Sequence, residues 1–149
     1  MVSRRKIVQG MGASIFLLSG CAQDPPRFEI GSIGVLNKDS QSHRVELKLK
    51  IKGKGVIYRA SQRAQAMEGE TAGGRNFSQK WPSEPKPFVI AARTEGMEKW
   101  ITAGPETPWD YSCHSIFLFI EENGELMIMA GECESATSQQ RVAIRSPNK

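Results

Sequence analysis

The feature that most constrains the fold is a strict alternation of apolar and charged residues between residues 43 and 52. Successive side chains of a β-strand point to opposite faces, whereas an α-helix repeats every 3.6 residues. Five consecutive matches to a period of two therefore predict a strand with one face on a core and the other in water. The predicted inner face carries His43, Val45, Leu47, Leu49 and Ile51. The predicted outer face carries Arg44, Glu46, Lys48, Lys50 and Lys52.

Other short apolar stretches, separated by Gly, Pro, Asn and Asp, indicate further strands and few helical stretches. We expect residues 28–59 to form a three-stranded meander and residues 88–102 to form a second hairpin. Residues 61–79 hold few large apolar side chains, so we predict a long loop there. The remaining predicted strands are 116–120, 126–130 and 142–144.

The clearest predicted hairpin joins two apolar stretches in the last third of the chain. Gly124 can adopt the left-handed conformation that closes a three-residue loop, Glu122-Asn123-Gly124. In that register Cys113 lies opposite Cys133, which predicts a disulfide in an oxidising compartment. A two-residue loop would instead put Cys113 opposite Glu134, so the predicted disulfide depends on the longer loop.

Both faces of this predicted hairpin are apolar. Such strands are covered on both sides in the middle of a sheet, or they expose one face to a partner, and the sequence leaves both alternatives open. One face carries Phe117, Phe119, Met127 and Met129. The other face carries Ile116, Leu118, Leu126 and Ile128.

About seven short strands with regularly spaced turn signals predict an all-β fold, an antiparallel β-sandwich. The pattern loosely resembles the immunoglobulin-like sandwiches of small secreted proteins. It differs from antibody-type domains because the cysteines would join neighbouring strands and not two sheets. We expect a single domain over residues 28–149, because a chain of this length has room for one core.

Residues 1–20 have the three parts of an export signal, namely a basic start, a short apolar run and small residues at the end. The signal runs into Leu18-Ser19-Gly20-Cys21, which resembles the lipobox of prokaryotic lipoproteins. The resemblance implies cleavage before Cys21, whose thiol then carries a diacylglyceryl group. Residues 21–27 would form a lipidated, proline-containing tether between the membrane and the domain.

The start of the signal bears on export and location. Ser3-Arg4-Arg5 resembles the twin-arginine export pattern, while Ile7 at a position where an aromatic residue is common leaves the general secretory route open. Either route places the domain on the extracytoplasmic side of the membrane, in the periplasm or at the cell surface. Because Ala22 and not Asp follows the cysteine, the lipoprotein resemblance implies the outer membrane in a Gram-negative host.

The charge balance argues against a nucleic-acid partner. Three of the 20 basic residues lie in the predicted signal, which contains no acid, and the other seventeen nearly balance the 16 acidic residues. A net charge this small gives no support for a general basic surface that binds nucleic acid. We therefore expect the membrane, reached through the lipid, and a protein as partners.

Residues with catalytic or metal-binding chemistry are few. Cys113 and His114, together with His43, form the grouping that most resembles a metal site, but the predicted disulfide removes the thiolate. We therefore expect neither a metal nor another cofactor. The sequence has no Gly-x-Ser-x-Gly elbow and no phosphate-binding glycine loop, so we expect a protein that is not an enzyme.

Two surfaces are candidates for binding. Lys48 and Lys50 lie on the charged face of the alternating strand, where a solvated surface is the plain alternative. Four aromatic residues come from loops or loop edges and could form an aromatic platform, or could cap the core: Trp81, Trp100, Trp109 and Tyr111.

The functional prediction follows from the anchor and from the lack of catalytic motifs. We expect a lipid-anchored cell-envelope protein whose sandwich acts as a binding or adaptor module for another envelope protein. One alternative is an extracytoplasmic carrier of a small ligand or metal at His43 and His114. A hydrolase is a third, less favoured, alternative.

Overall fold

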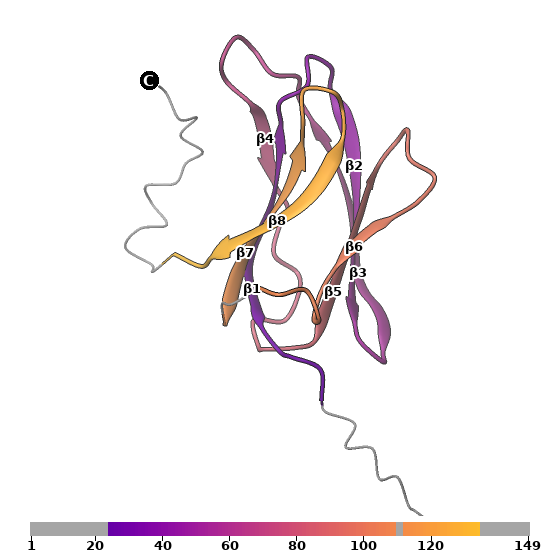
Figure 1. Ribbon diagram of the computed structural model, residues 1–149, viewed down its shortest axis with the longest axis vertical. Coiled ribbons are helices and arrows are strands. Elements are labelled where there is room, and N and C mark those ends of the chain that lie inside the picture. The colour runs from indigo at the N-terminus through magenta and orange to yellow at the C-terminus, as the bar shows by residue number, and fades with distance from the viewer. Residues whose placement is uncertain (1–23, 110–111, 135–149) are drawn as a thin grey trace, which may run out of the picture.

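In the computed structural model, which describes residues 24–109 and 112–134, the chain forms eight β-strands in two four-stranded sheets (Figure 1). The sheets enclose one apolar core, so the predicted all-β sandwich is confirmed. No helix within these ranges is long and apolar enough to cross a membrane. The strands are β1 (Glu29–Asn37), β2 (His43–Ile51), β3 (Gly55–Ala64), β4 (Gly73–Asn76), β5 (Phe88–Thr94), β6 (Ile101–Ala103), β7 (Cys113–Ile120) and β8 (Leu126–Glu132).

Several predicted features lie outside the described residues. They are the signal peptide 1–20, the lipidation site Cys21, the aromatic residue Tyr111 and the strand 142–144. These assignments stay predictions.

The alternation in β2 has the predicted consequence. Val45, Leu47 and Leu49 are buried in the core, and the charged residues between them face outwards. Full burial of each such aliphatic side chain contributes about 1.5–3 kcal/mol. The period-two pattern therefore sets the orientation of β2, with its charged face on the outside of the sandwich.

The predicted meander over residues 28–59 is wrong in its first step. β2 and β3 do form a hairpin, but β1 belongs to the opposite sheet, where it lies between β4 and β7. It pairs antiparallel with β4 and parallel with β7. Parallel neighbours need a crossover connection. Here the chain between β1 and β7 is that connection, and it contains all the strands of the β3-β2-β5-β6 sheet.

Asn37, the last residue of β1, explains why the chain changes sheets. Its side chain is fully buried, and its amide nitrogen donates to the carbonyl oxygens of Gln41, at 2.8 Å, and Gln65, at 3.0 Å. Its amide oxygen accepts a hydrogen bond from the backbone N–H of Asp39 at 2.9 Å. These bonds make residues 38–42 a corner between the two sheets and not a tight turn between neighbouring strands.

The predicted loop over residues 61–79 is partly strand. β3 continues to Ala64, and β4 lies inside this segment as an edge strand on β1. Both additions are polar edge strands, held by backbone pairing, so they carry little of the apolar signal that marks a buried strand. Gly73 packs closely here, because a Cβ at that position would lie 1.9 Å from the carbonyl oxygen of Gln65.

The β7–β8 hairpin confirms the predicted three-residue loop and disulfide. Ile120 pairs with Leu126, and Gly124 has a φ of 82°. Counting outward from this turn brings Cys113 opposite Cys133, and the two form a disulfide with a Cα–Cα distance of 5.3 Å. The disulfide therefore links neighbouring strands within one sheet.

The two apolar faces of this hairpin have different surroundings. The face that carries Ile116 and Leu118 is buried in the core. The other face points away from the core, and its Met127 and Met129 are 37 % and 46 % exposed. Of the two alternatives left open by the sequence, the described part of the structure therefore has the sheet whose second apolar face is not buried by residues 24–109 and 112–134.

Candidate functional site

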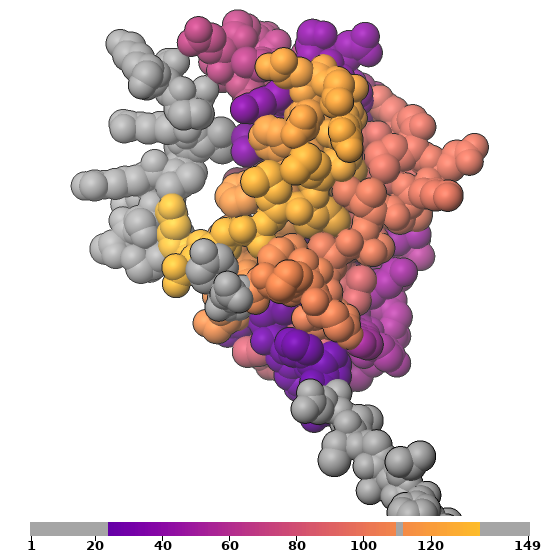
Figure 2. All heavy atoms as spheres, viewed as in Figure 1, coloured from indigo at the N-terminus to yellow at the C-terminus, as the bar shows by residue number. Residues whose placement is uncertain are grey.

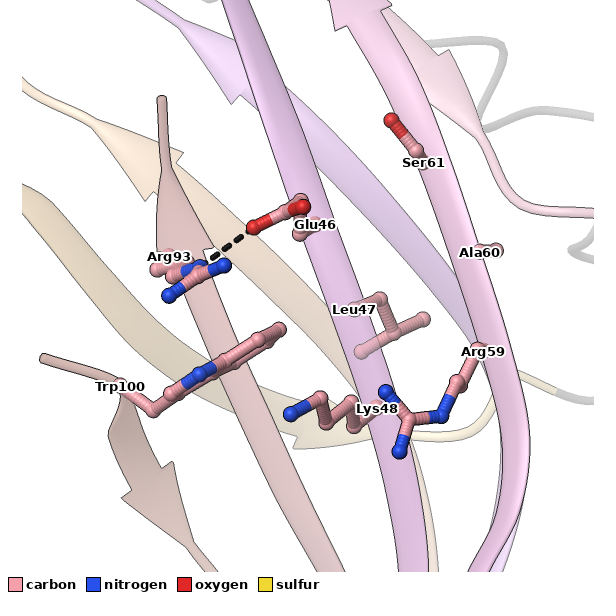
Figure 3. A pocket seen from close by; sticks show the side chains of 8 residues that line it. All are labelled: Glu46, Leu47, Lys48, Arg59, Ala60, Ser61, Arg93 and Trp100. Carbon is pink, nitrogen blue, oxygen red and sulfur yellow. Dashed lines mark hydrogen bonds and ion pairs between the residues drawn. The ribbon is translucent and has the colours of Figure 1, made fainter. Parts of the chain in front are cut away.

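A shallow hollow of about 350 Å³ lies on the outer face of the β3-β2-β5-β6 sheet (Figure 3). β2 crosses its floor, β3 and β5 flank β2 on either side, and the segment just before β6 closes one edge. The polar and aromatic side chains at the hollow are Glu46, Lys48, Arg59, Ser61, Arg93 and Trp100.

Strand register brings these side chains together. Glu46 of β2 lies directly opposite Ser61 of β3 and Arg93 of β5. Lys48, two residues further along β2, lies opposite Arg59. Directly paired residues share one face of a sheet, and residues two apart on a strand share it as well. All five therefore point outwards, while Leu47 between them points into the core.

Trp100 is the centre of a group of cations. The Lys48 ammonium lies 3.9 Å from the centroid of a Trp100 ring, and the Arg93 guanidinium carbon lies 4.5 Å from it. Each cation–π contact at an exposed site is worth about 0.5–1 kcal/mol. Arg93 is also ion-paired to Glu46, and this hydrogen bond holds the pKa of the Glu46 carboxyl below its usual value.

Lys48 lies in a positive environment. Its pKa is lowered, first by partial burial and then by the positive charges of Arg59, Lys50 and Arg93. Within the part of the chain that the structure describes, neither Lys48 nor Arg59 is ion-paired to a carboxylate. Glu46 offsets this repulsion only in part, so an anion in the hollow would relieve the remainder.

The positive charge extends beyond the hollow along the sheet. Arg44 lies opposite Arg63 at one end, where Arg63 is ion-paired to Glu95 at 3.9 Å, and Lys50 follows Lys48 at the other end. Among the outward residues of β2, β3 and β5 the structure thus has six basic side chains and one acidic side chain, Glu46. We call this surface the basic face; its cations are Arg44, Lys48, Lys50, Arg59, Arg63 and Arg93.

The predicted binding residues do not all lie here. Lys48, Lys50 and Trp100 belong to the basic face or adjoin it. Trp109 instead packs at one end of the core, with its ring centroid 5.9 Å from that of Phe28. The structure thus separates Trp109 from Trp100, and the end-of-core position is the plain alternative that the sequence offered for it.

Sequence reasoning missed Arg59 and Arg93. Arg59, Ser61 and Arg63 do alternate with smaller or less exposed residues, which is a strand signal. The prediction misses this signal because it places a loop from residue 61 onward. Arg93 follows the apolar part of β5, and only the pairing of β5 with β2 places it beside Glu46.

The two histidines lie at opposite ends of the sandwich and cannot bind one ligand together. His43 follows the corner at the end of β1, where its Nε2 lies 2.6 Å from the Asp39 carboxylate. His114 is buried near the start of β7, against the Phe28 ring, and burial lowers its pKa. Among the described residues no group of three or more His, Cys, Asp and Glu side chains could hold a metal ion.

Comparison with known proteins leaves the function to be argued from this geometry. No protein-family model matches the chain. No curated protein is similar enough in sequence to count as a relative.

Proposed function

We propose that this chain is a lipid-anchored, non-catalytic binding module of the cell envelope, whose basic face holds an acidic surface of a partner protein. The observation that carries this proposal is the cation group around Trp100. Lys48 and Arg59 face each other across β2 and β3 with no carboxylate partner among the described residues. A surface that keeps like charges close together is stabilised when an anionic group binds between them.

The anchor in this proposal comes from the lipobox-like Leu18-Ser19-Gly20-Cys21. A diacylglyceryl group provides two acyl chains, which hold a protein to a membrane far more stably than one. Only seven residues separate Cys21 from β1, and an extended chain of that length spans about 25 Å. The sandwich would therefore stand close to the membrane, on its extracytoplasmic side.

A protein surface fits the basic face better than a small ligand does. The hollow is open, and the cations continue past it to Arg44 and Arg63 on one side and to Lys50 on the other. A row of this kind matches a row of carboxylates and not one enclosed molecule. A carrier of a small anionic ligand, bound in the hollow alone, is the second candidate.

Photo-crosslinking in cells tests the proposal. A photoreactive benzoylphenylalanine replaces Ser61, which is exposed at the hollow. We expect it to capture a protein in the native background and to lose that product in Lys48→Glu/Arg59→Glu. The matched control is Lys54→Glu, which reverses an exposed lysine in the β2–β3 turn, and it should leave capture unchanged. Capture of no protein, or capture by Lys48→Glu/Arg59→Glu equal to that of the native background, would refute a protein-binding basic face.

The anchor has a separate test. Cys21→Ser should move the protein from the membrane fraction to the soluble fraction, because it removes the thiol that carries the lipid. A protein that stays with the membrane after this change would contradict lipidation at Cys21. To test the second candidate, inorganic phosphate is titrated into the purified protein while the Lys48 side chain is followed by NMR.

A further inference from the structure

The outer surface of the β4-β1-β7-β8 sheet carries a contiguous apolar patch that the described chain leaves largely open, with the Lys38 ammonium over the Phe119 ring, 5.2 Å from its centroid. Five apolar side chains, together with Glu121, line a hollow of about 380 Å³ on this surface. Large apolar side chains are rarely exposed together on a monomer without a partner. Figure 2 shows the atoms of the β7–β8 hairpin, coloured orange to yellow, as a broad part of the surface towards the viewer. We call this patch the apolar face; it consists of Leu36, Phe117, Phe119, Met127 and Met129.

One end of the apolar face is mainly acidic, and Lys38 is the cation that lies beside Glu121 and Glu122 there. Glu121 and Glu125 adjoin the β7–β8 turn, joined by a hydrogen bond from the Glu121 N–H to the Glu125 carbonyl at 2.9 Å. Their positions continue the outward series of Phe119 and Met127, so their side chains share the outer surface. Neither glutamate has an ion pair in the described part of the chain. Together with Glu122 in the turn, they form what we call the acidic rim.

We propose that a second copy of this chain occupies the apolar face and docks there with its own basic face. This inference rests on the proposed function, because it names the acidic protein surface that the basic face binds. The contact would be head to tail, with the basic face of one copy against the apolar face and acidic rim of the next.

The two surfaces are complementary in charge and in apolar character. Lys48 and Arg59 lack carboxylate partners, and Glu121 and Glu125 lack cationic ones. Trp100 and the aliphatic stems of the lysines and arginines provide apolar area that can cover Met127 and its neighbours. Matching potentials steer partners together and fix their register.

A symmetric contact of either surface with itself is disfavoured by the same charges. A contact between two basic faces would place the six cations of one copy against the six of the other. A contact between two apolar faces could place the glutamates of one acidic rim close to those of the other. Like charges facing each other cost several kcal/mol and suppress the wrong pairing. Charge therefore favours the contact between unlike faces over the contact between like faces.

The geometry of the anchor fits this arrangement. The two surfaces are the outer faces of the two sheets, so they lie on opposite sides of the sandwich. The segment before β1 leaves the sandwich at one end, the lower end in Figure 1. If copies stack in one orientation, with the basic face of each against the apolar face of the next, all their tethers lie at the same end of the sandwiches. A row of copies can thus form with every anchor in one membrane, where confinement raises the effective concentration.

Reciprocal charge reversal tests the inference in cells that express the full chain. Benzoylphenylalanine replaces Met129, and two variants are made, Lys48→Glu/Arg59→Glu and Glu121→Lys/Glu125→Lys. We expect the native background to give crosslinked dimers and longer multiples of the same chain. Each variant alone should lower their yield by about tenfold or more, as expected for reversing close charge pairs. Co-expressing the two variants with different tags should restore mixed dimers, because each then meets a surface of opposite charge.

A matched control reverses charges outside both surfaces, in Lys54→Glu/Glu68→Lys, and should leave the yield unchanged. Thermal melting of each purified variant checks that the fold is intact. Crosslinks from position 129 to a different protein, or a yield that the reversals do not change, would overturn the inference. If the probe at Ser61 still captures an acidic protein other than this chain, the proposed function stands without the inference. If Ser61 captures nothing, both fail.

Discussion

Replacing Asn37 by Ala should lower the free energy of unfolding by about 3 kcal/mol. Asn37 is fully buried at the corner where the chain leaves one sheet for the other. Its side chain makes hydrogen bonds at 2.8 and 3.0 Å to the carbonyls of Gln41 and Gln65, and one at 2.9 Å from the N–H of Asp39.

The magnitude follows from these three bonds. Each intramolecular hydrogen bond contributes about 1 kcal/mol net, and a buried partner left unpaired costs about 1–3 kcal/mol. Truncation therefore removes at least about 3 kcal/mol from a total stability of about 5–15 kcal/mol. For a domain of this size the melting temperature should fall by roughly 10 °C.

Urea unfolding of the purified protein measures the effect, with Asn123→Ala as the matched control. Asn123 is an exposed turn residue whose side-chain oxygen accepts one hydrogen bond, from the N–H of Glu125 at 3.0 Å. The same substitution there should cost less than about 1 kcal/mol. If Asn37→Ala costs no more than Asn123→Ala, the buried amide does not hold the corner and this explanation of the crossover is wrong.

Three further predictions concern single groups. Burial lowers the pKa of His114 in the folded state. The contribution of this neutral histidine to the free energy of unfolding is therefore fully present above about pH 6.5 and falls as the pH drops below that value. His114→Phe should remove this pH dependence, measured by urea unfolding. The double variant Cys113→Ala/Cys133→Ala should lose about 3 kcal/mol of stability, and thiol titration of the unfolded, unreduced protein should find neither thiol free. Arg59→Gln should raise the pKa of Lys48 towards its ordinary value, measured by NMR of the side chain, because it removes the neighbouring positive charge that lowers it; an unchanged pKa would show that the two cations do not interact.

Much of the fold is predictable where the pattern is local. The alternation in residues 43–52 sets which side chains of β2 are buried, because a strand has no other way to place an apolar face on a core. The three-residue loop before Glu125 sets the register of β7 and β8, and through it the pairing of Cys113 with Cys133. Register, once a turn fixes it, extends along the whole hairpin.

The candidate site was only half predictable. Lys48, Lys50 and Trp100 stand out in the sequence, but nothing local indicates that Arg59 and Arg93 join them. Those arginines come from strands on either side of β2 and are brought there by pairing across the sheet. The same holds for the acidic rim, whose importance depends on the adjoining apolar face, which the described residues leave exposed at Met127 and Met129.

The sequence by itself therefore determined most of the strands, the inward and outward faces of the main strands and the disulfide. These depend on side-chain period and turn chemistry, which act over a few residues. Only the tertiary structure decided that β1 crosses to the other sheet and pairs with β7, and that β4 forms inside a polar segment. Such pairings join strands distant in sequence, and they are selected by the burial and hydrogen bonding of the whole sandwich, including the buried amide of Asn37.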